Sequence, residues 1–203
     1  MNHVLVVMQA RSGSSLLTRI FHEHGLWMGQ SRGTHGWGYE TYESRNVHNY
    51  MDGSEITSEG LKSSFLDEIP KDTRAVLKTS IQMHKQWIVA LPEADFVFMV
   101  RDAAAVAESL WRKGRTDKKR NVMLPHAKMW NDRIYWSSVI GDRPLVLMSR
   151  VMEGDYSSLE VAMDACGMKM DSSIVDSCID KKLWHCQPKT HEVEPLEKHY
   201  GKF

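Results

Sequence analysis

Apolar and polar positions along the chain predict strands that are followed by helices. The first apolar run, residues 3–8 (HVLVVM), is continuous, which is typical of a strand buried on both faces of a parallel sheet. Residues 14–24 carry apolar side chains at helical spacing, and Gly25 follows them. This pattern predicts an amphipathic helix that ends at the glycine. A polar turn, residues 9–15, connects the strand to the helix.

The same alternation continues through most of the chain. Further strands are predicted at residues 75–77, 95–100 and 145–148. Helices are predicted at 42–51, 58–69, 83–91, 103–112, 157–166 and 172–178, with a long helix through 130–140 and a basic loop at 113–121. Strands that alternate with helices favour an α/β domain with a parallel sheet.

Composition narrows the class of protein. A chain of 203 residues is expected to form a single domain, 1–203. Its 26 basic and 26 acidic residues balance, which argues against a general nucleic-acid binder. Three cysteines without a C-x-x-C pair predict reduced thiols and a cytoplasmic location. We also expect no signal peptide, no membrane span and no metal site.

Polar residues follow the predicted strands where a parallel sheet binds its ligands, beyond the carboxyl ends of the strands. They are residues 11–15, residues 78–80 and Arg101 with Asp102. The first group opens a helix, and a helix N-terminus attracts anions. The usual nucleotide-triphosphate loop is absent, because Met8 stands where it requires glycine and Ser14 where it requires lysine. The sequence therefore predicts a site for an anion other than a magnesium-bound triphosphate.

Two motifs, in order and on the expected elements, resemble those of the P-loop sulfotransferases, in particular the short bacterial or viral members. Arg11-Ser12-Gly13-Ser14-Ser15 resembles their 5′-phosphosulfate loop. The stretch FVFMVRDAAAVAESL, which holds Arg101 and Ser109 eight residues apart, resembles their 3′-phosphate motif. Between them, VLKTS and the lead-in LPEAD are similar to the middle strand and the Leu-Pro segment of bacterial members. The resemblance covers residues 3–112 and continues more weakly to about 185.

The resemblance implies a three-layer αβα P-loop-type fold and the donor 3′-phosphoadenosine-5′-phosphosulfate (PAPS), without a metal. Within residues 1–203 it gives core motifs at 3–112, a helical C-terminal part at 122–186 and a polar tail at 187–203. The residues that it implies for donor binding are Arg11, Ser12, Gly13, Ser14, Ser15, Arg101 and Ser109.

Arg11, Lys78 and Glu43 are the catalytic residues that the resemblance implies. Glu43 lies in GYETYESRNVHNYM and is the expected base, with Glu40 and His35 as alternatives. Animal cytosolic members carry an aromatic residue and a histidine where this chain has Leu16 and Ser80. Adenine stacking and base catalysis are therefore not expected at these two positions.

The expected reaction transfers a sulfuryl group to a hydroxyl or amine of a small-molecule or carbohydrate acceptor. Residues 29–56 and 113–130 are expected to line the acceptor pocket. Two alternatives stay open, a small-molecule or nucleotide kinase that uses ATP and Mg²⁺, and a non-catalytic relative that binds the nucleotide. The sequence does not predict the identity of the acceptor or the oligomeric state.

Overall fold

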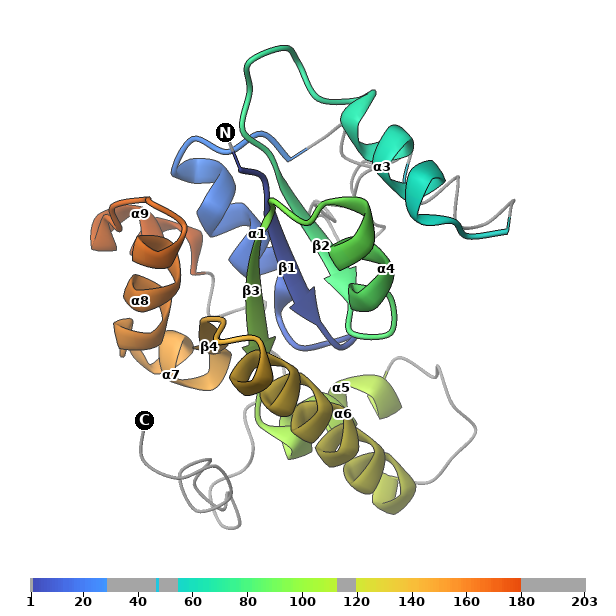
Figure 1. Cartoon of the computed structure of the whole chain (residues 1–203). Coiled ribbons are helices and arrows are strands. Elements are labelled where there is room, and N and C mark those ends of the chain that lie inside the picture. The colour runs from blue at the N-terminus through green and yellow to red at the C-terminus, as the bar shows by residue number, and fades with distance from the viewer. Residues whose placement is uncertain (1, 29–46, 48–54, 113–119, 180–203) are drawn as a thin grey trace.

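The structure is a computed structural model of the 203-residue chain, and it describes residues 2–28, 47, 55–112 and 120–179 (Figure 1). In this part of the chain four parallel strands form one sheet, in the order β2-β1-β3-β4. They are β1 (Val4–Met8), β2 (Val76–Ser80), β3 (Asp95–Val100) and β4 (Leu145–Leu147). The strand that comes first in the sequence lies inside the sheet, as its continuous apolar run predicts.

Helices cover both faces of this sheet (Figure 1). One face carries α1 (Ser14–Glu23), α7 (Met148–Glu153), α8 (Ser157–Ala165) and α9 (Ser172–Cys178). The other face carries α3 (Ser58–Leu66) and α4 (His84–Ala90). The helices α5 (Ala103–Arg112) and α6 (Arg120–Ile140) pack against each other toward the carboxyl ends of the strands.

Alternate residues of β1 enter two separate hydrophobic clusters. Val4 and Val6 pack with residues of α1, α8 and α9 on one face, and Leu5 and Val7 pack with residues of α3 and α4 on the other. All four side chains are fully buried. Burial on both faces explains why this strand has no polar position, and it confirms the predicted three-layer α/β fold.

Several element boundaries differ from the sequence-based prediction, and three of these differences exceed a shift of the end of a predicted helix. The second strand does not end at residue 77, because Lys78 to Ser80 continue the ladder with β1 and pair with Val6 to Met8. The fourth strand ends at Leu147, and Met148 begins α7, which was not predicted. The helix α6 begins at Arg120, inside the predicted basic loop. Backbone pairing across the sheet overrides the loss of apolar side chains at residues 78–80.

Two further findings concern helices. No helix within the described ranges combines the length and the apolar character that crossing a membrane requires. The predicted helix at 42–51 lies outside the described residues, apart from Val47, which is helical and buried.

Candidate functional site

Buried polar side chains gather at the carboxyl edge of the sheet, where β1, β2 and β3 end. Among the described residues, the polar or charged side chains that are at most 8% exposed at this edge include Gln9, Ser12, Ser14, Thr79, Arg101, Ser109 and Asn131. Burial of so many polar groups is costly unless they are bonded to one another. The hydrogen bonds among them define the candidate site.

The turn after β1 is shaped by its own residues. The Ser12 hydroxyl donates to the Gln9 carbonyl oxygen at 2.7 Å and is fully buried, so this side chain fixes the turn. Gly13 is the N-cap of α1 with φ 97°, and its carbonyl oxygen accepts the N–H of Leu17, the first i to i−4 bond of the helix. The amides of Gly13, Ser14 and Ser15 precede that bond, which is the arrangement that binds anions at helix N-termini.

Arg11 adopts a backbone conformation that is uncommon for a residue with a side chain. Its φ is 70°, in the left-handed region, where strained residues are often functional. Its Nε donates to the Ser109 hydroxyl of α5 at 2.9 Å. This bond spans 98 positions of sequence and joins the two motifs directly. A guanidinium has five N–H donors, and the bond to Ser109 uses one.

Arg101 lies at the end of β3 and is 5% exposed. Its Nη1 donates to the carbonyl oxygen of Arg11 at 3.1 Å, so the two arginines stand at the same place on the edge. The neighbouring Asp102 has a different task, since its Oδ1 accepts the N–H of Ala105 at 2.8 Å and caps α5. The strand end therefore supplies one cation to the site and one helix cap.

Lys78 brings a third cation to the same edge. It pairs with Val6 in the sheet and is half-buried, and its Nζ donates to the hydroxyl of Ser15 at 3.0 Å. Ser15 belongs to the first turn of α1. The described bonds of Arg11, Arg101 and Lys78 thus connect these cations to neutral oxygens of the turn, of α1 and of α5.

The structure brings together the predicted residues of the turn with Lys78, Arg101 and Ser109. Glu43, Glu40 and His35, the candidates for the base, lie outside the described residues.

The first residue of α4, His84, is a buried histidine near the end of β2. It is 8% exposed, and its Nδ1 lies 2.9 Å from the carbonyl oxygen of Ile81. Its ring packs edge-on against Phe98.

Two residues of the site were not predicted from the sequence. The Gln9 Nε2 donates to the Asn131 Oδ1 at 2.5 Å, and the Asn131 Nδ2 donates to the carbonyl oxygen of Arg101 at 2.7 Å. The sequence could have indicated Gln9 as a site residue, because it is a polar residue directly after an apolar strand. It could not have indicated Asn131, since Asn131 is one of many polar residues in the long helix α6.

Within the described ranges, no side chain is a candidate for a reactive thiol, and no group of side chains is a candidate for a metal site. Burial raises the pKa of Cys166 to about 12 and also raises the pKa of Cys178, so both thiols stay protonated at neutral pH. In the part of the chain that the structure describes, no three histidine, cysteine or acidic side chains are grouped so that they could hold a metal ion.

No family model and no curated protein matches this sequence. Solved structures do match. The sulfotransferase domain of the Synechococcus PCC 7002 olefin synthase is 15% identical, over 97% of this chain and 85% of that domain, with a TM-score of 0.56. A sulfotransferase domain from the curacin biosynthetic pathway is 8% identical, over 98% and 95%, with a TM-score of 0.57.

A third match is the mouse sulfotransferase SULT7A1, which was solved in complex with PAP. It is 10% identical, over 87% of this chain and 62% of the mouse protein, with a TM-score of 0.56. At such low identity the likeness concerns the fold. The chain has the fold of the sulfotransferases, and the resemblance seen in its motifs is confirmed at that level.

Proposed function

We propose that this protein is a PAPS-dependent sulfotransferase, which moves a sulfuryl group from the donor to a hydroxyl or amine. The observation that carries the proposal is the bond from Arg11 Nε to the Ser109 hydroxyl. It joins a loop that resembles a 5′-phosphosulfate site to a helix that resembles a 3′-phosphate site, at the edge where parallel sheets bind ligands. The sulfotransferase fold and the PAP complex of the mouse protein support the choice of donor.

The donor carries two phosphate groups, and each has a proposed place at this edge. The amides of Gly13, Ser14 and Ser15 would hold the 5′-phosphate at the N-terminus of α1. Arg101 and Ser109 would hold the 3′-phosphate. Ser109 accepts from Arg11 through its oxygen, so its own O–H would donate to the phosphate. A buried guanidinium is well suited to this task, because its planar fork matches a phosphate.

The transfer step requires positive charge near the bond that breaks. The acceptor oxygen or nitrogen attacks sulfur, the bond from sulfur to the bridging oxygen of the 5′-phosphate breaks, and adenosine 3′,5′-bisphosphate (PAP) leaves. Arg11 would neutralise the charge that grows on the bridging oxygen, and Lys78, held at Ser15, would add a second cation. The donor has no β- or γ-phosphate, so the proposal includes no metal.

The proton of the acceptor must pass to a base. Glu43 is our first choice, with Glu40 and His35 as alternatives, and a carboxylate is competent there if burial brings its pKa toward neutrality. The acceptor is proposed to be a small molecule or a carbohydrate. Cytoplasmic location and the division of residues 1–203 into motif core, helical part and tail also stay predictions.

Nucleotide binding tests the proposal. PAP without Mg²⁺ should raise the unfolding temperature. At a PAP concentration of one hundred times its Kd, the free energy of unfolding should increase by about 2.7 kcal/mol. ATP with Mg²⁺ should stabilise the protein much less. Stabilisation by ATP and Mg²⁺ alone would favour the kinase alternative and overturn the proposal. Transfer of labelled sulfuryl from PAPS to a mixture of phenols, alcohols, amines and sugars then separates an enzyme from a non-catalytic nucleotide-binding protein.

A further inference from the structure

A closed ring of hydrogen bonds ties α6 to the ends of β1 and β3. Gln9 donates to Asn131, Asn131 donates to the carbonyl oxygen of Arg101, and the Arg101 side chain donates to the carbonyl oxygen of Arg11. The backbone from Arg11 back to Gln9 completes the ring, and the Ser12 hydroxyl fastens this segment to the Gln9 carbonyl oxygen. Asn131 is the member of the ring that comes from α6.

We propose that Asn131, oriented by Gln9, is a positioning residue that fixes Arg101 for recognition of the 3′-phosphate of the donor. This inference rests on the proposed function. Asn131 is 2% exposed and Gln9 is 6% exposed, so both side chains are almost completely shielded from solvent. Asn131 acts through Arg101, whose carbonyl oxygen it holds.

The chemistry of the ring requires an amide at position 131. The carbonyl oxygen of Arg101 accepts hydrogen bonds and donates none, so the Asn131 Nδ2 must face it. The Oδ1 then faces the Gln9 Nε2, which is a donor and also lies 3.5 Å from the carbonyl oxygen of Ala127. An aspartate of the same shape would place an acceptor against the Arg101 carbonyl oxygen.

Burial gives the ring its strength. A hydrogen bond inside a protein is electrostatically stronger than in water, and a buried polar group that loses its partner is costly. Without Asn131 the Arg101 carbonyl oxygen would lose a buried donor, and the end of β3 could shift. Since the Arg101 side chain also holds the Arg11 carbonyl oxygen, such a shift would change the distance between the two proposed phosphate sites.

Two nucleotides separate this role from a purely structural one. PAP carries both phosphates, and adenosine 5′-monophosphate (AMP) lacks the 3′-phosphate. The ratio of Kd for AMP to Kd for PAP therefore reports the 3′-phosphate contacts. We expect Asn131→Leu and Asn131→Asp to lower this ratio about tenfold, with little change in AMP affinity. Gln9→Met should lower it about threefold.

Ser138→Ala is the matched control. Ser138 lies on the same helix, is 3% exposed and donates its hydroxyl hydrogen bond to the carbonyl oxygen of Arg143, away from the ring. This variant should lower the unfolding temperature and leave the ratio unchanged. In the Arg101→Ala background, Asn131→Leu should lower the ratio no further, because Asn131 acts through Arg101.

Calorimetric titration of wild type and variants gives a clear decision. An unchanged ratio in folded Asn131→Leu and Asn131→Asp would overturn the inference while leaving the proposed function intact. A further fall in the double variant would also overturn it, since Asn131 would then act independently of Arg101. Failure of the wild-type protein to bind either nucleotide would overturn the proposed function and the inference together.

Discussion

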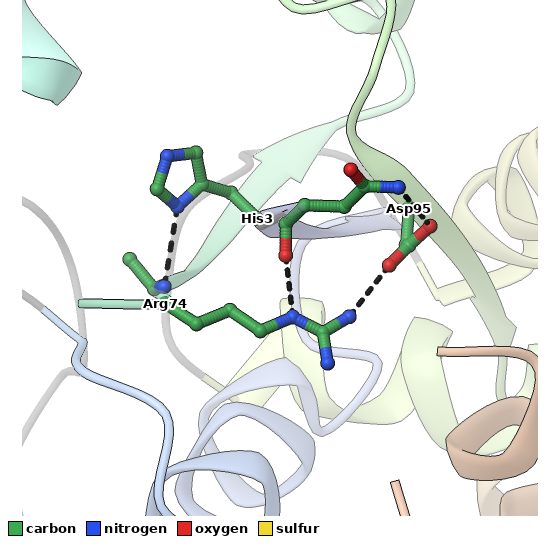
Figure 2. A network of polar contacts seen from close by, with 5 residues as sticks. His3, Arg74 and Asp95 are labelled. Atoms are coloured by element: carbon green, nitrogen blue, oxygen red, sulfur yellow. Dashed lines mark hydrogen bonds and ion pairs between the residues drawn. The ribbon is translucent and has the colours of Figure 1, made fainter. Parts of the chain in front are cut away.

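Charged side chains cluster at both edges of the sheet, and the partners of those charges differ. At the amino edge, the Arg74 Nη2 bonds the Asp95 carboxylate at 2.5 Å and its Nε donates to the carbonyl oxygen of Asn2 (Figure 2). Asn2 also donates to Asp95 at 3.3 Å, and the N–H of Ala75 donates to His3 Nδ1 at 3.2 Å. A cation and an anion of similar burial face each other there.

At the carboxyl edge, Arg11, Lys78 and Arg101 bond a hydroxyl, a second hydroxyl and a carbonyl oxygen. The bond from Arg11 to the neutral Ser109 hydroxyl holds this guanidinium in place without cancelling its charge, and the amides at the N-terminus of α1 lie beside it. The amino edge is therefore suited to joining three segments of the fold, while the carboxyl edge is suited to binding an anion. Five measurements follow, from the largest expected effect to the smallest; the first tests the proposed base, and the other four test this division of labour between the edges.

The largest effect is expected from the proposed base. Glu43→Gln keeps the shape of the side chain and removes its basicity, so turnover should fall about 10²–10⁴-fold while PAP affinity holds. The acid limb of the pH–rate profile should disappear as well. Steady-state transfer from labelled PAPS measures both. Normal turnover in this variant, with loss in Glu40→Gln or His35→Ala, would move the base to one of those residues.

Arg11→Ala comes next and tests whether the carboxyl edge stabilises developing charge. We expect kcat to fall about 10²–10³-fold, with a smaller effect on PAP affinity, because the charge of Arg11 matters most as the bridging oxygen becomes negative. Single-turnover kinetics with titration of PAP separates the two effects. If the loss of affinity accounts for the whole loss of rate, Arg11 is a binding residue and this role is wrong.

Arg101→Ala tests binding at the same edge. The 3′-phosphate is remote from the reacting sulfur, so PAP affinity should fall more than kcat does. Loss of the charged contacts is expected to cost about 1.5–3 kcal/mol, which is about a 10- to 100-fold increase in Kd. Calorimetric titration with PAP measures it. An unchanged Kd would remove Arg101 from the donor site.

Arg74→Ala is the matched change at the amino edge. Removing the guanidinium leaves the half-buried Asp95 carboxylate without this cation, so the free energy of unfolding should fall by about 1–3 kcal/mol. PAP affinity of the folded variant should equal that of the wild type. Denaturant titration and calorimetry give the two values. A loss of PAP affinity as large as that of Arg101→Ala would break the distinction between the edges.

The smallest effect concerns the pH dependence of stability at the amino edge. Burial lowers the pKa of His3 from its ordinary value of 6.5. The His3 Nδ1 accepts the N–H of Ala75, which requires that Nδ1 carries no proton. Glu93 opposes this shift and Arg74 adds to it. Because the folded pKa is the lower one, the contribution is present above pH 6.5 and is lost as the pH falls toward the folded value.

His3→Asn supplies the control for this prediction, since its side-chain oxygen accepts the same N–H and does not titrate. Urea titrations of wild type and variant at a series of pH values should show a smaller decline of stability below pH 6.5 in the variant. PAP affinity should be the same in both. Equal declines would show that His3 does not contribute to acid destabilisation.

The sequence by itself predicted most of the helices and strands, although not α7, and it supplied the residues of the proposed donor site. Continuous apolar runs predict the buried strands, and helical spacing with Gly25 predicts α1 and its end. The order of the two motifs predicts the sulfotransferase fold. These features are readable because they depend on neighbours along the chain, whose side chains either fit or do not fit a buried strand or a helix face.

Only the tertiary structure decided which of these residues meet. The bond from Arg11 to Ser109 spans 98 positions, and the bond from Asn131 to Arg101 spans 30. Their geometry depends on the register of the parallel strands and on where α5 and α6 pack, which no local pattern specifies. The same holds at the amino edge, where the pairing of β1 with β2 and β3 brings His3, Arg74 and Asp95 together. Local sequence patterns specify the individual elements, whereas strand pairing and helix packing over long sequence distances determine which side chains come into contact.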